Sequence, residues 1–260
     1  MTVAHRIRRM TGWHWLAFFG TVLGAWALLY AMQVPGDLRT GAALYGHDFW
    51  SALCVVEPGL AGYPTVLAMW VAMSAAMMAP TFLPALATYE DLIATGAATR
   101  DGFLALLAGY LAVWLGFAAL AAGAQVGLAG AGLLDPLGGS RSALLTALLL
   151  ALAGAYQFTA LKEACLSKCR QPLTFFMQHW APGPARAAAM GLRLGVLCLG
   201  CCWALMALAF VGGTMNLAWM GLATLVMVLE KLPEIGRPVT RPLGLVLLAA
   251  AIATLVAGTG

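Results

Sequence analysis

Residues Gly195–Met206, GVLCLGCCWALM, contain no charged side chain and place three cysteines within five positions. They lie at the centre of a longer apolar run, residues 188–211. A helix that spans the hydrocarbon core of a bilayer needs about 20 mostly apolar residues. The stretch therefore predicts a membrane helix with an unusual amount of sulfur.

The composition of the whole chain supports the same class of protein. Of its 260 residues, 62% are hydrophobic and only 9% are charged, and the mean hydropathy is +0.89. Soluble domains contain roughly 25% charged residues, so this chain is expected to be an integral membrane protein. Its basic start resembles a secretory signal, but the apolar run continues from Trp13 to about Gln33 without an A-x-A site, which predicts a retained first helix.

The apolar runs predict an all-α transmembrane bundle that forms a single domain over residues 1–260. We expect seven spans, with six as the alternative because the sixth run is short and the second contains Pro80 and Pro84. The predicted spans are residues 13–33, 64–86, 103–128, 142–164, 188–211, 215–230 and 242–258.

The basic residues predict how this bundle is oriented. With seven spans, every lysine and arginine except Arg39 and Arg141 lies on the side of the N-terminus. Cytoplasmic loops have an excess of Lys and Arg, so we expect the N-terminus inside and the C-terminus outside, in a bacterial inner membrane. The loop at 34–63 then lies outside. Its His47-Asp48 pair is interpreted as solvated, and its Cys54 has no external cysteine partner for a disulfide.

Sulfur side chains recur four residues apart, which places them on one face of a helix. The sulfur residues that share a face are Met69, Met73 and Met77 with Met78 beside them in the second span, Cys165 and Cys169 at the end of the fourth, and Cys198, Cys202 and Met206 with Cys201 beside them in the fifth.

This set of donors favours monovalent copper. Thiolates and thioethers select Cu(I), whereas a zinc site usually includes histidine or four cysteines. The three helices concerned contain no histidine. We therefore expect a Cu(I) site built from the fourth and fifth spans together with the second.

Three alternatives stay open at this point. Free cysteine and methionine also serve as ordinary packing residues, as they would in a structural or assembly subunit. Cys198-x-x-Cys201 has the spacing of thiol–disulfide exchangers, although an apolar helix disfavours the reactive thiolate. Methionine and cysteine can also be axial ligands of haem.

Polar residues at the predicted helix ends form a second group of candidates. Lys162 and Lys231 are interpreted as interfacial anchors that extend toward water. Glu230 lies at a helix C-terminus, where a carboxylate opposes the helix dipole, so it needs a cationic partner such as Lys162 or Lys231, or a proton-linked or gating role. Tyr156 and Gln157 are expected to bridge helices or to line a path.

Four motifs together resemble a known bacterial family. They are MWVAMSAAMMAP (69–80), YQFTALKEACLSKCRQP (156–172), GVLCLGCCWALM (195–206) and MNLAWMGLATLVMVLEK (215–231). The family is that of predicted metal-binding integral membrane proteins, a domain of unknown function. The resemblance implies metal binding and a multi-helix membrane fold, and it supplies neither an activity nor a transported species.

From these observations we expect a membrane protein that transports Cu(I) or hands it to a partner. No P-loop is present to drive primary transport, and no catalytic set indicates an enzyme. The expected partners are the lipid bilayer, the metal ion and a protein such as a copper chaperone or a membrane oxidase, with no nucleic acid.

Overall fold

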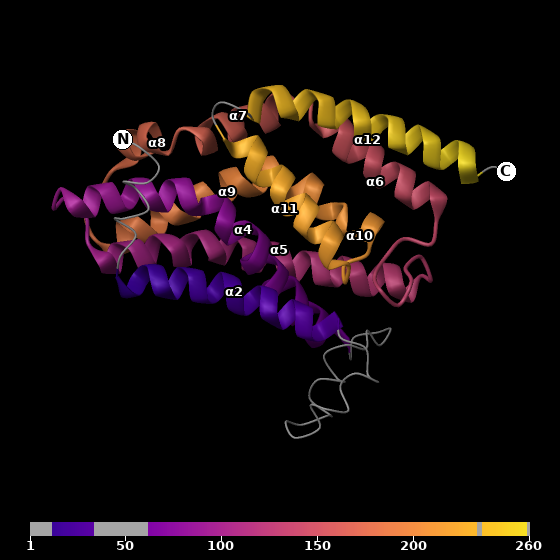
Figure 1. Ribbon diagram of the computed structural model, residues 1–260, viewed down its shortest axis with the longest axis horizontal. Coiled ribbons are helices and arrows are strands. Elements are labelled where there is room, and N and C mark those ends of the chain that lie inside the picture. The colour runs from indigo at the N-terminus through magenta and orange to yellow at the C-terminus, as the bar shows by residue number, and fades with distance from the viewer. Residues whose placement is uncertain (1–11, 34–61, 233–235, 259–260) are drawn as a thin grey trace, which may run out of the picture.

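The computed structural model describes residues 12–33, 62–232 and 236–258, and all regular elements within them are helices (Figure 1). The predicted outer loop with Cys54 and the His47-Asp48 pair lies almost entirely outside the described residues. The helices are α2 (Trp13–Gln33), α4 (Tyr63–Ala94), α5 (Arg100–Gly130), α6 (Ala143–Tyr156), α7 (Ala160–Arg170), α8 (Pro172–His179), α9 (Pro184–Ala207), α10 (Ala209–Gly212), α11 (Leu217–Lys231) and α12 (Gly236–Gly258).

The long helices run along the longest axis of the molecule (Figure 1). At the centre of the bundle, α5 packs against both α4 and α9. Two glycines allow the close contact between α5 and α9. A Cβ atom on Gly109 would collide with the backbone oxygen of Ala188, and one on Gly191 would collide with that of Leu106. Small residues commonly let membrane helices approach in this way, because lipid provides no hydrophobic drive between them.

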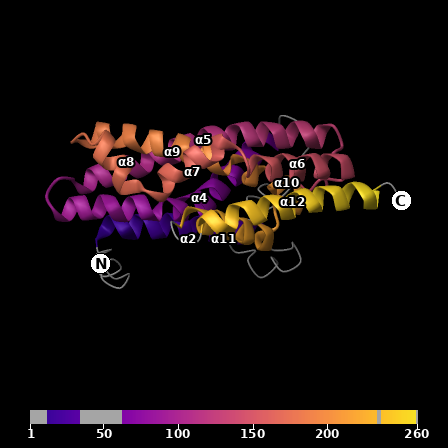
Figure 2. The same cartoon turned by 90° about the horizontal axis from the view of Figure 1, so that it is seen from above.

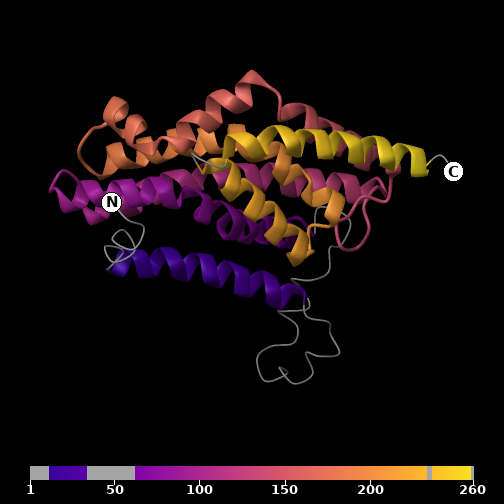
Figure 3. The ribbon, with the colours of Figure 1, turned by 45° about the horizontal axis from the view of Figure 1, so that its top comes forward.

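Helix α2 lies on the outside of the bundle against α4 (Figure 3). His14 Nε2 is 2.7 Å from Glu90 Oε2, and Trp15 Nε1 donates to the same oxygen at 3.1 Å. Trp26 Nε1 donates to the backbone oxygen of Ala76 at 3.1 Å. That oxygen is available because Pro80, four residues later, has no N–H to donate to it.

Helices α6 and α12 lie side by side at one end of the molecule (Figure 2). The fourth predicted span, residues 142–164, is not one helix. It divides into α6 and α7, whose axes differ by 63°. Thr159 begins α7 as its N-cap, since its hydroxyl accepts from the backbone N–H of Lys162 at 3.3 Å.

The expected count of seven spans is not supported by the helix lengths. In the described residues, five helices are long and apolar enough to cross a membrane, or six if the bent α6–α7 pair counts as one span. The predicted span at 215–230 forms α11, whose 15 residues extend only about 22 Å, less than the hydrocarbon core of roughly 30 Å. The predicted orientation depended on seven spans and loses that support.

Candidate metal centre

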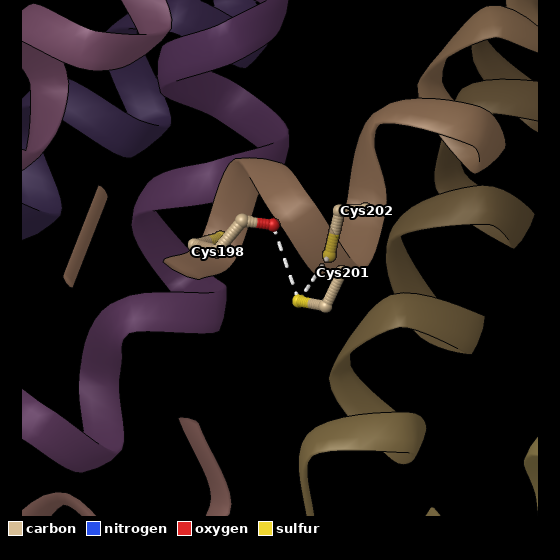
Figure 4. A group of neighbouring side chains, drawn as sticks. All are labelled: Cys198, Cys201 and Cys202. Atoms are coloured by element: carbon tan, nitrogen blue, oxygen red, sulfur yellow. Dashed lines mark hydrogen bonds between the residues drawn. The ribbon is translucent and has the colours of Figure 1, made fainter. Parts of the chain in front are cut away.

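Three thiols of α9 converge inside the bundle. Cys198, Cys201 and Cys202 are each only 1% exposed, and their Sγ atoms all lie within 4.8 Å of one another. The thiols of Cys201 and Cys202 are 3.3 Å apart, and Cys201 donates to the backbone oxygen of Cys198 at 3.1 Å (Figure 4). A metal–sulfur bond is roughly 2.3 Å long, so two sulfurs on opposite sides of one ion lie up to about 4.6 Å apart. The cluster therefore has the dimensions of a site for a single thiophilic ion.

The two cysteines of α7 lie beside this cluster and are less deeply buried. The side chain of Cys169 lines the same small cavity as Cys198. Cys165 packs against Gly200 of α9, where a Cβ atom would be only 2.7 Å from its Sγ. All five predicted cysteines thus lie along the contact between α7 and α9, from half-buried to fully buried.

The predicted methionines are all buried. Met206 lies one turn after Cys202 on α9, and Met73, Met77 and Met78 lie on α4. The polar contact from α4 to the cysteine cluster is made by Thr81, whose Oγ1 is 3.9 Å from Cys198 Sγ. A role for the thioethers as ligands stays a prediction.

Two residues outside the predicted set of sulfur ligands contact Cys198 directly: Lys231, which was predicted only as an interfacial or gating residue, and Tyr110, which was not predicted. Lys231 Nζ is 2.9 Å from Cys198 Sγ and donates to Thr81 Oγ1 at 2.7 Å. Tyr110 of α5 places its hydroxyl 2.9 Å from Cys198 Sγ and donates to the backbone oxygen of Met78 at 3.0 Å. A signal for Tyr110 did exist, because a polar side chain in an otherwise apolar membrane helix commonly has a function.

These side chains surround a small cavity of about 20 Å³, lined in part by Thr81, Tyr110, Cys169, Cys198 and Lys231. This volume is the space open to the centre of a water-sized sphere, and a water molecule needs roughly 10–15 Å³ of it. The cavity therefore has room for one particle of that size, next to sulfur and next to a cation.

Lys162 of α7 and Glu230 of α11 form a buried ion pair between these two helices. Lys162 Nζ donates to both carboxylate oxygens of Glu230, at 2.9 and 3.0 Å, and each side chain is 1% exposed. Arg170 Nε donates to the backbone oxygen of Glu230 at 2.8 Å. The expectation that Lys162 and Lys231 extend toward water is wrong, since both are buried. Lys162 is the cationic partner that Glu230 was expected to need.

Tyr156 and Gln157 lie at the break between α6 and α7. The hydroxyl of Tyr156 donates to the backbone oxygen of Gly200, and so bridges α6 to α9. The buried amide of Gln157 has no hydrogen-bond partner among the described residues. Gln157 lines an open cavity of about 780 Å³ together with Glu163, Arg241 and other residues. This cavity is separate from the thiol cluster, because no cysteine lines it.

Comparison with protein families matches residues 67–254 to the PpoB2 family, which is described as copper chaperone. The chain belongs to the PpoB2 family. The match extends from α4 to α12 and includes all five cysteines of the site. Neither a curated protein nor a solved structure matches the chain. Membership of the PpoB2 family and the buried thiol cluster both support copper handling, and the apolar helices are compatible with membrane insertion.

Proposed function

We propose that this protein is a membrane-embedded chaperone that binds Cu(I) at Cys198, Cys201 and Cys202 and hands it to a protein partner. The observation that carries the proposal is the convergence of three buried thiols in a chain of the PpoB2 copper chaperone family. Thiolates favour Cu(I) over harder ions. The cluster contains neither histidine nor carboxylate among the described residues, which fits Cu(I) better than a zinc site.

The cysteines of α7 are proposed as the route by which copper enters and leaves. Cys165 and Cys169 are only half-buried, and Cys169 lines a cavity together with Cys198. A Cu(I) ion can pass along such a row by gaining one sulfur ligand before it loses another. Met206, Met73, Met77 and Met78 are proposed as further soft donors around the buried end of the row.

We place the chain in the bacterial inner membrane as a single helical domain with five or six spans. The turn at residues 95–99 and helix α8 lie at the same end of the molecule (Figures 1 and 3). Arg100 and Arg186 lie near this end, at the starts of α5 and α9. By the positive-inside rule, this end is proposed to face the cytoplasm, where a partner such as a soluble copper chaperone is accessible.

Metal content tests the proposal directly. The full chain is purified in detergent under anaerobic conditions, loaded with Cu(I), and compared with a Cys198→Ser/Cys201→Ser/Cys202→Ser variant by elemental analysis and X-ray absorption. We expect one copper per chain with sulfur-only coordination in the wild type, and none in the triple variant. Cys54→Ser is the matched control and should keep its copper.

The alternatives predict different results in the same experiment. If the cysteines only pack, the triple variant matches the wild type, which binds no tight copper. A thiol redox protein would exchange disulfides with a small-molecule disulfide at a useful rate, and a haem-handling protein would show a Soret band after purification. Any of these results would overturn the proposal.

A further inference from the structure

Lys231 is a buried cation at the C-terminal end of α11, with only 4% of its surface exposed. Among the described residues, its ammonium group donates hydrogen bonds to Thr81 Oγ1 and Cys198 Sγ and forms no ion pair with a carboxylate. Burying a charge is costly unless an opposite charge lies close to it. The ammonium group therefore needs an anion, and a thiolate of the cluster is the group in contact with it.

The neighbouring carboxylate does not meet this need. Glu230 precedes Lys231 in the chain, but both of its carboxylate oxygens accept from Lys162. Its backbone oxygen accepts from Arg170. The two acid–base pairs are thus separate: Lys162 balances Glu230, and Lys231 faces the sulfur cluster.

The charge of a copper-loaded site explains why a cation would be held next to the thiol cluster. If two of the three cysteines bind as thiolates and the third stays a neutral thiol, the two thiolates and one Cu(I) ion have a net charge of −1. That charge is unfavourable in an apolar interior where no water screens it. An ammonium group within hydrogen-bond distance of one of the sulfurs brings the sum to zero. Tyr110 and Thr81 hold neutral hydroxyl groups against the same sulfur and cation, and they do not change this sum.

We infer that Lys231 is the counter-cation of the copper–thiolate complex, a positioning residue that makes an anionic Cu(I) site possible inside the bundle. The inference rests on the proposed function, since it assumes that the cysteine cluster binds Cu(I). A tethered cation that occupied the place of copper would have the opposite effect, because copper would have to displace it. The two roles predict opposite changes in Cu(I) affinity when the charge of Lys231 is removed. Removing a counter-cation weakens Cu(I) binding, and removing a competitor strengthens it.

The test measures Cu(I) affinity of the full chain in detergent by competition with a chromophoric chelator, with Ag(I) as a redox-inert second probe. Lys231→Met removes the charge and keeps a long apolar side chain, and Lys231→Arg keeps the charge. Lys168→Met, the same substitution at an exposed position of α7, is the matched control. We expect a loss of affinity of about 100-fold or more for Lys231→Met, since it leaves an unbalanced buried charge. The loss should be within about tenfold for Lys231→Arg, and Lys168→Met should bind like the wild type.

A double variant shows whether the effect acts through Cys198. In a Cys198→Ser background, Lys231→Met should add little further loss, because the sulfur that it balances is absent. The thermal unfolding midpoint of each metal-free variant is recorded alongside, and Lys231→Gln replaces Lys231→Met if the latter does not fold. Equal or tighter binding by the neutral variants would overturn the inference alone. A wild-type chain that binds no Cu(I) would overturn the proposed function itself.

Discussion

Cys198 is the residue at which three other helices meet α9. Its thiol contacts Lys231 of α11, Tyr110 of α5 and, more distantly, Thr81 of α4. A thiol buried among apolar side chains is inert, whereas a thiol beside a cation is stabilised as the thiolate that binds metals. The surroundings of Cys198 therefore fit metal binding better than packing.

The buried pair of Lys162 and Glu230 should dominate the stability of this region. Glu230→Gln leaves Lys162 without an anion in the interior, so we expect the free energy of unfolding to fall by about 3–5 kcal/mol. The double variant Lys162→Met/Glu230→Leu removes both charges and should recover much of that loss. Unfolding in detergent, followed by circular dichroism, measures both.

Glu163→Gln is the control for this pair, because the Glu163 side chain is 56% exposed and its contact with Arg170 is long, at 3.5 Å. It should change stability little, as expected for an exposed ion pair. Wild-type stability in Glu230→Gln would contradict the buried pair.

Cys165 should affect the rate of copper transfer and not the amount bound. It is half-buried and lies outside the cluster of three thiols. Cys165→Ser is therefore expected to keep one Cu(I) per chain but to release it several-fold more slowly to a chelator, measured by stopped-flow absorbance. Loss of stoichiometry in this variant would instead make Cys165 a ligand of the buried ion.

At the scale of elements, the site depends on two interrupted helices, one that begins at a break and one that ends at a buried residue. Helix α7 begins at the break after α6, and α11 ends at Lys231, beside Cys198. Interrupted helices are where membrane proteins commonly place ion sites, because charged side chains at their ends can be held within protein. The charged residues of α7 and α11 meet each other for this reason.

The contact between α5 and α9 predicts a second stability effect. Gly191→Ala places a methyl group against the backbone of α5, so we expect a loss of about 1–3 kcal/mol from overpacking. Gly116→Ala on α5 is the control, because its position is open. The unfolding midpoints of the two variants should differ clearly, and equal midpoints would mean that the helices do not pack as described.

At the scale of the whole molecule, the arrangement of the helices predicts which segments share a side of the membrane. The α4–α5 and α8–α9 connections lie at one end of the bundle, and the α5–α6 connection lies at the other (Figure 1). Cysteines are introduced at Ala98 and Pro182 in the first two connections and at Leu137 in the third. In intact cells, a membrane-impermeant maleimide should label Leu137→Cys and spare the other two until the membrane is opened. The parent chain, with its native cysteines, gives the background. The reverse pattern would invert the orientation that we propose.

Sequence patterns were sufficient for the helical fold class and for the grouping of the cysteines within each helix. Spacings of three and four residues act along one helix, and they correctly placed Cys198, Cys201 and Cys202 close together. They were not sufficient for the span count, because the break after Tyr156 and the early end of α11 lie within apolar runs.

Local composition and periodicity are enough to establish that the chain is built from apolar helices and that one of them holds a cluster of thiols. The residues that contact this cluster are known only from the packing of the helices. Lys231 lies 33 positions from Cys198, and Tyr110 lies 88 positions away on another helix. Contacts of this kind depend on how helices pack across the bundle, and no periodicity within a single helix encodes them.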